Sequence, residues 1–102
     1  MLGMRLMAKT ADKIRFQKLV ELGCIVCLRN GYGYSQPEIH HCRFAGSMGK
    51  KATSMETLPL CPQHHRLGSY GVAYHAGKVA FEENFGTEES LLQFTNQLLG
   101  VT

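Results

Sequence analysis

The sequence contains no tryptophan, and phenylalanine and tyrosine together make up only 9% of its 102 residues. A chain of this length forms a single domain and buries only about two-thirds of the surface that it exposes when unfolded. Because large aromatic side chains are scarce, aliphatic side chains have to provide most of the apolar burial. The resulting core is small, which favours an additional stabilising element such as a bound metal ion.

Long apolar runs are also absent. No stretch approaches the roughly 18 consecutive apolar residues that a membrane span needs, and the opening MLGMRLMAK is too short and too mixed for a secretory signal. The sequence therefore predicts a cytoplasmic protein that does not associate with membranes. In that reducing compartment the four cysteines are expected to be metal ligands or buried thiols rather than two disulfides.

The charged residues are unevenly distributed along the chain. The formal net charge of +3 says little about partners by itself. Most lysines and arginines nevertheless lie in the first two-thirds of the chain, whereas Glu82, Glu83, Glu88 and Glu89 gather near its end. One part of the molecule is therefore expected to be able to face phosphate groups.

The order of apolar, polar and turn residues predicts an α+β domain. A first helix is expected from about Thr10 to Leu22, with its basic residues facing water or DNA. Residues 1–9 show no clear period and are expected to be a poorly ordered lead-in to a single zinc-containing domain over residues 10–102. The residues expected on the buried side of this helix are Ile14, Leu19, Val20 and Leu22.

The middle of the chain predicts short elements separated by turns. GCIVC is expected to form a tight turn, RNGYGYSQ a hairpin or loop, and residues 37–44 a short strand. The stretch AGSMGKKATS (45–54) lacks an apolar period and predicts an exposed basic loop. A second short strand over residues 58–61 precedes Pro62, which suits the first turn of a short helix that ends near Gly68.

The final helix has the clearest signals, and it is expected to follow another helix that ends at Gly86. Thr87 is a good cap, and Glu88 and Glu89 suit the first turn because carboxylates interact favourably with the helix dipole. An apolar stripe then runs to Gly100. The residues of this stripe are Leu91, Leu92, Phe94, Leu98 and Leu99.

Two pairs of possible metal ligands share the same spacing. Two residues separate Cys24 from Cys27, and two residues separate Cys61 from His64. This spacing lets a tight turn aim both members of a pair at one tetrahedral ion. The sequence therefore predicts a structural Zn²⁺ held by Cys24, Cys27, Cys61 and His64.

Two other ligand sets compete with this one. Cys42 is the competitor of His64 for the fourth position, but it has no partner at the same spacing and lies inside the expected strand. The twelve residues between Cys27 and His40 match the first part of a two-Cys, two-His zinc finger. That finger also needs a second histidine three to five residues after the first, and residues 44–46 contain none.

Four histidines remain once the zinc site is assigned, namely His40, His41, His65 and His75. Adjacent residues on a strand point to opposite faces, so one member of the pair at 40–41 can bind a metal while the other reaches a water molecule. Phosphodiester hydrolysis needs this division, because a cation neutralises the phosphate while a neutral imidazole takes a proton from water. His65 and His75 can complete the shell of such a cation.

The order of these segments resembles the HNH nuclease superfamily, also called ββα-metal or His-Me finger nucleases. The segments that carry the resemblance are a first Cys-x-x-Cys, then EIHHCRFAG, then LPLCPQHHR. The sequence is most similar to phage recombination enhancement nucleases of the Ref type, whose core also runs from a GCIVC-like turn through an IHH strand to an LCPxHH knuckle and a GVxxHAGK segment. The resemblance covers roughly residues 15–92.

This resemblance implies a small ββα-metal core, braced by the structural zinc and flanked by N- and C-terminal helices. His41 would be the general base. The middle Asn of the motif has no counterpart here, and only Ser47, Thr53, Ser54 and Thr57 offer hydroxyls in that region. The implied ligands of one catalytic Mg²⁺, Mn²⁺, Ni²⁺ or Zn²⁺ are His40, His65 and His75, with Glu82 as the alternative to His75.

The function implied is a DNA endonuclease of phage recombination or repair, acting in a bacterial host or phage-infected cell together with a RecA-type recombinase filament. Two other hypotheses stand beside it. One is a non-catalytic zinc module that binds nucleic acid or a recombination protein, and the other is a zinc hydrolase with a different substrate. The residues expected to contact DNA phosphates are Arg43, Lys50, Lys51, Arg66 and Lys78.

Overall fold

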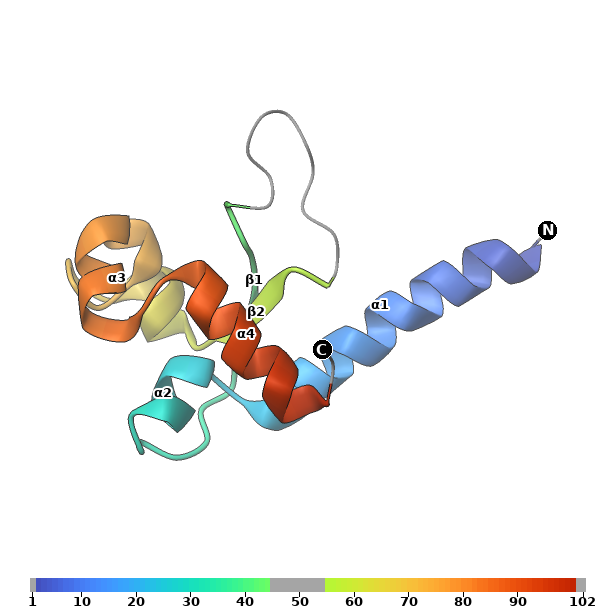
Figure 1. Ribbon diagram of the computed structural model, residues 1–102, viewed down its shortest axis with the longest axis horizontal. Coiled ribbons are helices and arrows are strands. Elements are labelled where there is room, and N and C mark those ends of the chain that lie inside the picture. The colour runs from blue at the N-terminus through green and yellow to red at the C-terminus, as the bar shows by residue number, and fades with distance from the viewer. Residues whose placement is uncertain (1, 45–54, 101–102) are drawn as a thin grey trace.

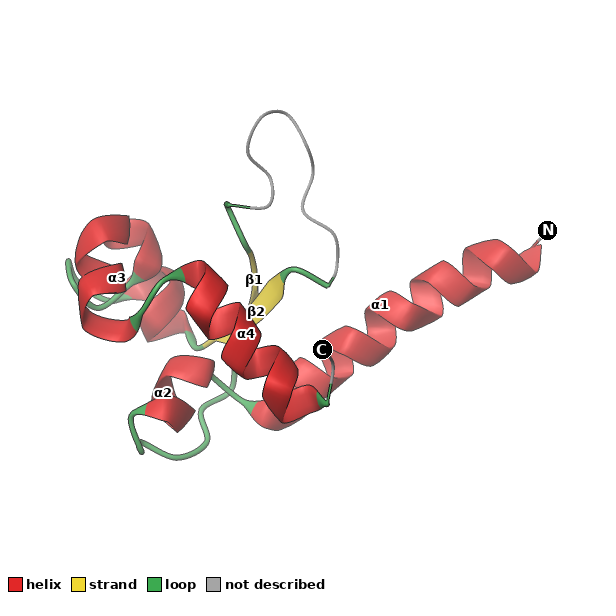
Figure 2. Cartoon of the chain, in the orientation of Figure 1, coloured by secondary structure: helices red, strands yellow, loops and turns green. Residues whose placement is uncertain are grey.

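A long N-terminal helix, α1 (Leu2–Leu22), leads into the folded body of the protein (Figures 1 and 2). The computed structural model describes residues 2–44 and 55–100, and the side chains from Asp12 onward. The loop expected over residues 45–54 lies outside the described residues. The helix expected to begin at Thr10 begins at Leu2, because residues 2–9 consist mainly of good helix formers such as Leu, Met, Arg, Ala and Lys. The predicted division into a lead-in over residues 1–9 and a single domain over residues 10–102 stays a prediction.

The buried side of α1 differs from the prediction. Leu19 is buried as expected, but Ile14 and Val20 are 47% and 41% exposed. Arg15, which was expected to face water or DNA, is only 4% exposed. Arg15 and Leu19 lie four residues apart on one face of the helix. This face of α1 packs against the rest of the protein. Arg15 can be buried there because it donates hydrogen bonds to Thr57 of β2 and Asn96 of α4.

The end of α1 is set by Gly23, as the sequence predicts. Gly23 has φ of +86°, and a Cβ at this position would lie 2.7 Å from the Tyr34 ring. The Tyr34 hydroxyl donates a hydrogen bond to the carbonyl of Val20 at 2.7 Å. This packing closes the loop over residues 30–37 back onto α1. In the sequence, the short helix α2 (Ile25–Arg29) lies between α1 and this loop, where a tight turn was expected.

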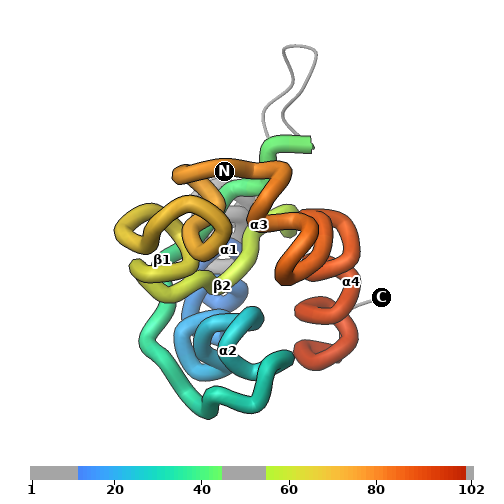
Figure 3. The backbone as a smooth tube through the Cα atoms, turned by 90° about the vertical axis from the view of Figure 1, so that its left-hand side faces the viewer, coloured from blue at the N-terminus to red at the C-terminus, as the bar shows by residue number. Residues whose placement is uncertain are grey.

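Two strands form the only sheet among the described residues. β1 (Glu38–His41) pairs antiparallel with β2 (Thr57–Leu60), so that His40 lies opposite Leu58 and His41 opposite Thr57. The first strand is shorter than the expected 37–44. α1, α2 and α4 all contact β2, and Figure 3 shows α2 beneath the strands and α4 along one side.

Short helices follow the sheet. After Pro62 come η2 (Gln63–Leu67), a single wide helical turn, and η3 (Tyr74–Ala76), then α3 (Lys78–Phe85). The last helix, α4 (Glu88–Leu99), is capped as predicted, because the Thr87 hydroxyl accepts a hydrogen bond from the Ser90 amide. Leu91 of its stripe is fully buried, whereas Leu98 is 48% exposed. The protein is therefore a small α+β fold with one two-stranded sheet among the described residues.

The core lies between the sheet and the surrounding helices, and it contains all four cysteines. Because a core this small provides limited apolar burial, stabilisation from a bound ion would add substantially to it. Among the described residues, no helix is both long and apolar enough to cross a membrane. The main core residues are Cys24, Ile25, Val26, Cys27, Cys42, Leu58, Leu60, Cys61, Tyr74, Phe81 and Leu91.

Candidate metal centres and active site

The first cluster joins two turns that lie far apart in the sequence. Cys24 directly precedes α2 and Cys27 lies within it, Cys61 follows β2, and His64 lies in η2. All four side chains are buried, and each offers a ligand atom within 4.8 Å of the others. The cluster therefore contains both predicted pairs and could hold a metal ion such as zinc.

The distances within this cluster fit a tetrahedral ion. With Zn–S bonds of about 2.3 Å and Zn–N bonds of about 2.0 Å, tetrahedral edges are about 3.8 Å between sulfurs and about 3.5 Å between sulfur and nitrogen. Cys27 Sγ lies 3.9 Å from Cys61 Sγ. The Nδ1 atom of His64 lies 3.7, 3.6 and 3.2 Å from the sulfurs of Cys24, Cys27 and Cys61. The donor set and its spacing thus fit a tetrahedral ion such as zinc.

The surroundings of the cysteines matter for metal binding. Burial raises the pKa of the Cys24 thiol, and burial together with the neighbouring thiols raises the pKa of Cys27 to about 12. Burial also acts on Cys61, but hydrogen bonds from the His64 backbone and other neighbours leave its pKa below the ordinary value. Without a cation, two of the thiols therefore hold their protons firmly, so that a metal ion has to displace them.

Cys42, the competitor for the fourth ligand, belongs to a different part of the core. Its amide donates a hydrogen bond to the carbonyl of Glu56, and burial followed by the nearby Glu88 carboxylate raises its pKa to about 12. The structure brings His64, and not Cys42, to the other three cysteines. A buried thiol with a raised pKa is unreactive.

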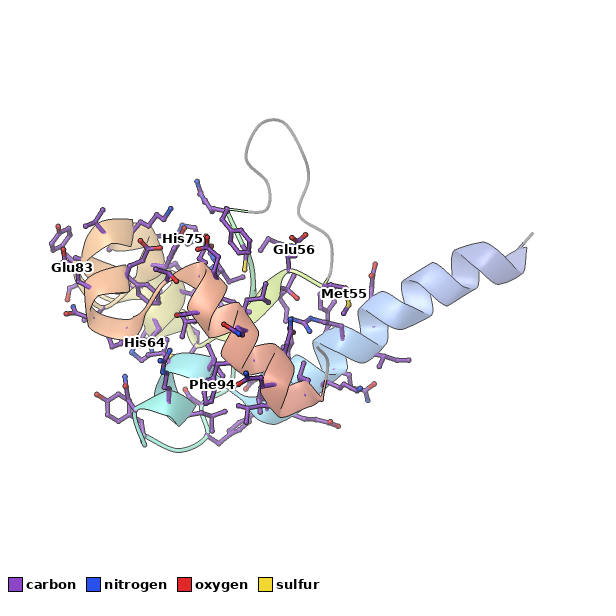
Figure 4. All side chains as sticks on the ribbon, in the orientation of Figure 1. Met55, Glu56, His64, His75, Glu83 and Phe94 are labelled. Carbon is purple, nitrogen blue, oxygen red and sulfur yellow. The ribbon has the colours of Figure 1, made fainter. Side chains whose placement is uncertain are left out.

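A second cluster contains three of the four remaining histidines. His40 from β1, His65 from η2 and His75 from η3 each offer a ring nitrogen within 4.8 Å of the others. His40 is buried, His65 is half-buried and His75 is exposed. The cluster is therefore closed on one side and open to solvent on the other. In Figure 4, the labelled His64 lies beside α2, whereas the labelled His75 lies further from α2, towards the top of the view.

Two carboxylates hold the histidines of this cluster. Glu88 Oε2 lies 2.6 Å from His40 Nε2, and both side chains are almost fully buried. Glu38 Oε1 lies 2.9 Å from His65 Nδ1. Metal-binding histidines in proteins almost always donate their second ring N–H to such a partner, which fixes the tautomer and orients the ring.

In the part of the chain that the structure describes, no carboxylate hydrogen-bonds to the third histidine, His75. Although this side chain is exposed overall, partial desolvation of its ring, followed by the neighbouring His65 and His40 and then Arg43, lowers its pKa. A neutral imidazole is the form that can bind a metal ion. Among the described residues, the group formed with His40 and His65 contains His75 and not Glu82, the predicted alternative.

His41 lies at the end of β1 and is exposed, whereas its neighbour His40 is buried, as strand alternation predicts. Across the sheet it pairs with Thr57, which is one of the hydroxyl residues considered in place of the missing Asn. The Thr57 hydroxyl accepts a hydrogen bond from Arg15 Nε at 3.2 Å, and its carbonyl accepts one from Arg15 Nη2 at 2.8 Å. Arg15 therefore supports the strand position opposite His41.

A cavity of about 250 Å³ adjoins the histidine cluster at His75. Arg43 and Lys78 contribute positive charge to its lining. Tyr74 contacts the His40 ring at a centroid distance of 4.6 Å, and its buried hydroxyl lies near the Glu88 carboxylate without a hydrogen bond of regular geometry among the described residues. Burial and the nearby Glu88 carboxylate raise the pKa of this hydroxyl. The residues lining the cavity are Arg43, Tyr74, His75, Ala76, Gly77 and Lys78.

The other predicted DNA contacts have different surroundings. Arg66 forms a bidentate ion pair with Glu38, at 2.6 Å between Nη2 and Oε2. These hydrogen bonds, followed by the one from His65, lower the pKa of Glu38 to about 2. Lys50 and Lys51 lie outside the described residues. Of the predicted contacts that the structure describes, Arg43 and Lys78 line the cavity and Arg66 does not.

Sequence reasoning missed Glu38, Glu88 and Arg15 as parts of the site. Glu38 had a usable signal, because it lies two residues before His40 and so shares a strand face with it. Glu88 had none, since an acidic residue in the first turn of a helix is normally explained by the helix dipole. Its role follows only from the position of α4 relative to β1.

Comparison with known proteins identifies the family. A family model described as recombination enhancement, RecA-dependent nuclease matches residues 8–100, which is almost the whole chain. Neither a curated protein nor a solved structure matches the chain. The family match confirms the resemblance to recombination nucleases that the Cys-x-x-Cys, IHH and LCPxHH segments indicated. The chain therefore belongs to the family of recombination enhancement, RecA-dependent nucleases.

Proposed function

We propose that this protein is a divalent-metal-dependent DNA endonuclease of the HNH type, in which β1, β2 and η2 form the ββα-metal core. The observation that carries the proposal is the histidine cluster. Three imidazoles from three separate elements offer ring nitrogens within 4.8 Å of one another, at a site that is buried on one side and exposed on the other. An ion held there would have open coordination positions, which a catalytic site requires.

The residues of this cluster fit a catalytic ion. His40 and His65 each have one ring nitrogen bound to a carboxylate, so that the other nitrogen is available for the ion. Three imidazoles suit Zn²⁺ or Ni²⁺ better than Mg²⁺, which prefers oxygen ligands. When bound, the ion would neutralise the charge that develops on the scissile phosphate and leaving oxygen.

His41 is proposed as the general base. Its imidazole is exposed at the end of β1, next to the buried His40, and a neutral imidazole there can accept a proton from the attacking water. Arg43 and Lys78 supply positive charge at the neighbouring cavity, where DNA phosphates would bind. Arg66, Lys50 and Lys51 remain proposed contacts further along the backbone.

The cysteine cluster is proposed to hold a structural Zn²⁺ through Cys24, Cys27, Cys61 and His64. The four buried ligands leave no position for substrate, which is typical of a structural site. Because His64 and His65 are consecutive in η2, an ion at this site would also hold His65 in place. The structural ion therefore supports the proposed catalytic cluster without taking part in the reaction.

The family description suggests how the substrate is presented. Members are described as RecA-dependent, and we propose that this chain cuts DNA held by a RecA-type recombinase filament, in phage recombination or repair. In this arrangement the filament would present the DNA to the proposed site.

A plasmid-nicking assay tests the proposal. Protein containing only the structural zinc is supplied in turn with Mg²⁺, Mn²⁺, Ni²⁺ or Zn²⁺, with and without a RecA-type filament on the DNA. We expect cleavage with at least one ion, and its loss in His65→Ala and His75→Ala variants that keep their zinc content. If the folded protein binds DNA but never cuts it under any of these conditions, it is a non-catalytic zinc module instead.

A further inference from the structure

The burial of Glu88 is unusual for a residue in the first turn of a helix. Its side chain is only 1% exposed, whereas the next residue, Glu89, is exposed. A carboxylate that served only the helix dipole could remain in water at no desolvation cost. Burying this charge is unfavourable unless several hydrogen bonds compensate, so its partners show what the residue does.

Three donors that hydrogen-bond to the Glu88 carboxylate lie in β1 and in the residues after it. Oε2 accepts hydrogen bonds from His40 Nε2 at 2.6 Å and from the Arg43 amide at 2.8 Å. Oε1 accepts a hydrogen bond from the Phe44 amide at 3.2 Å. One carboxylate thus ties the start of α4 to a histidine of the cluster and to the backbone of a residue that lines the cavity.

These contacts determine the state of the His40 ring. An ionised carboxylate only accepts hydrogen bonds, so His40 must carry a proton on Nε2. In the neutral imidazole, Nδ1 then keeps the lone pair. The Tyr74 ring, at a centroid distance of 4.6 Å, packs against the same imidazole and limits its rotation.

We propose that Glu88 is a positioning residue, which fixes His40 as the Nε2–H tautomer and holds Arg43 at the rim of the cavity. The first effect presents Nδ1 of His40 as the metal ligand. The second sets the backbone from which the Arg43 side chain reaches phosphate. The catalytic consequence rests on the proposed function, whereas the tautomer of His40 does not.

The pair formed by Glu38 and His65 provides an internal comparison. Glu38 is 28% exposed and shares its carboxylate between His65 and Arg66. Partial exposure weakens such a contact, because water can replace it. Loss of the Glu88 carboxylate should therefore affect the cluster more than loss of the Glu38 carboxylate.

The first experiment reads the tautomer directly. Nitrogen-15 NMR of the histidine side chains, recorded on zinc-containing protein without further metal, should show His40 as a single Nε2–H tautomer in the wild type. Glu88→Ala should produce a mixed or inverted tautomer at His40, whereas the matched control Glu89→Ala should leave it unchanged. A folded Glu88→Ala protein that keeps the Nε2–H form would overturn the proposal.

The second experiment measures the consequence for metal binding. Ni²⁺ is titrated into protein that already contains its zinc, and Glu88→Ala should weaken binding about 10–100-fold, as loss of an outer partner of a metal-binding histidine does. Equal Ni²⁺ affinity in the wild type and Glu88→Ala would contradict the positioning role. If the wild type itself binds no Ni²⁺ and cuts no DNA, the proposed function fails, and the NMR result still decides the role of Glu88.

A conservative variant covers the case in which Glu88→Ala does not fold. Glu88→Gln keeps one oxygen that can accept from His40, but it loses the negative charge and turns an amide N–H₂ toward the Arg43 or Phe44 amide. We expect this variant to retain the His40 tautomer and to bind Ni²⁺ more weakly than the wild type and Glu89→Gln. A Glu88→Gln protein that loses the Nε2–H form of His40 but keeps the Ni²⁺ affinity of the wild type would overturn the proposal, because metal binding would then not depend on the tautomer.

Discussion

His64 and His65 are neighbours in the chain, yet their side chains enter different clusters. His64 Nδ1 lies 3.2 Å from Cys61 Sγ, whereas His65 Nδ1 lies 2.9 Å from Glu38 and its ring lies 4.8 Å from that of His75. Consecutive residues of a helical turn point in different directions around its axis, so the short turn η2 can serve two sites. The geometry of the proposed active site should therefore depend on the cysteine cluster.

Removing one ligand of the cysteine cluster should destabilise the whole protein. Cys61→Ala is expected to lose stoichiometric zinc and to unfold, because the folding of small metal-containing domains depends on zinc binding worth about 10–16 kcal/mol in zinc-finger peptides. Metal content and thermal melting measure both effects. Cys42→Ala is the matched control, since Cys42 is equally buried but lies outside the cluster. Full zinc content in Cys61→Ala would exclude this ligand set.

Zinc retention should depend on pH with a defined sign. Burial raises the pKa of Cys24 and that of Cys27, the latter to about 12, in the ion-free protein. Zinc has to displace these protons, so its affinity should fall as the pH falls, by about tenfold per pH unit for each proton displaced. The stability contributed by zinc is thus present at neutral and higher pH and is lost on acidification. Competition with a chromogenic chelator between pH 8 and about pH 5 measures this slope, and a pH-independent affinity would contradict it.

The proposed general base can be removed without disturbing the fold. His41 is exposed, so His41→Ala should leave zinc content and melting temperature unchanged. Nicking of DNA should fall about 10²–10⁴-fold, which is the usual contribution of a general base. The measurement is single-turnover cleavage with the ion that activates the wild type. Wild-type cleavage by the variant would remove His41 from the mechanism.

The cavity residues should contribute to DNA binding through charge. Arg43→Ala and Lys78→Ala should each weaken binding and reduce the slope of log K against log salt concentration by about 0.9 for duplex DNA. The control is Lys13→Ala, a change of an exposed lysine on α1 that does not line the cavity. Fluorescence anisotropy over a series of salt concentrations measures the slope. Unchanged slopes in both cavity variants would show that phosphates bind elsewhere.

The buried arginine of α1 should matter for stability. Arg15 donates hydrogen bonds to Thr57 and to Asn96, at 2.7 Å for Asn96 Oδ1, and thereby joins α1, β2 and α4. Arg15→Met should destabilise the protein by about 2–4 kcal/mol, because it leaves buried acceptors without donors. Lys18→Met, on the exposed side of the same helix, should change stability by less than about 0.5 kcal/mol. Denaturant unfolding measures both variants, and equal midpoints would show that Arg15 is dispensable.

Local features of this protein could be predicted from its sequence because their causes are local. Two-residue spacing brings Cys24 and Cys27, and likewise Cys61 and His64, to one side of a tight turn wherever those turns occur. Thr87 and Gly100 bound the last helix because capping depends only on neighbouring residues. The burial of His40 and the exposure of His41 likewise follow from strand alternation.

Only the tertiary structure decided which side chains complete the site. The contact between His40 and Glu88 joins residues 48 positions apart, and that between Arg15 and Asn96 joins residues 81 positions apart. Both buried residues, Arg15 and Glu88, resemble ordinary surface charges in the sequence. Their burial became favourable because the packing of α1 and α4 against the sheet supplied hydrogen-bond partners that replace water. The sequence by itself predicted the residues of the two clusters, with Cys42 and Glu82 as alternatives. The packing of distant elements decided between these alternatives and determined which residues support the clusters.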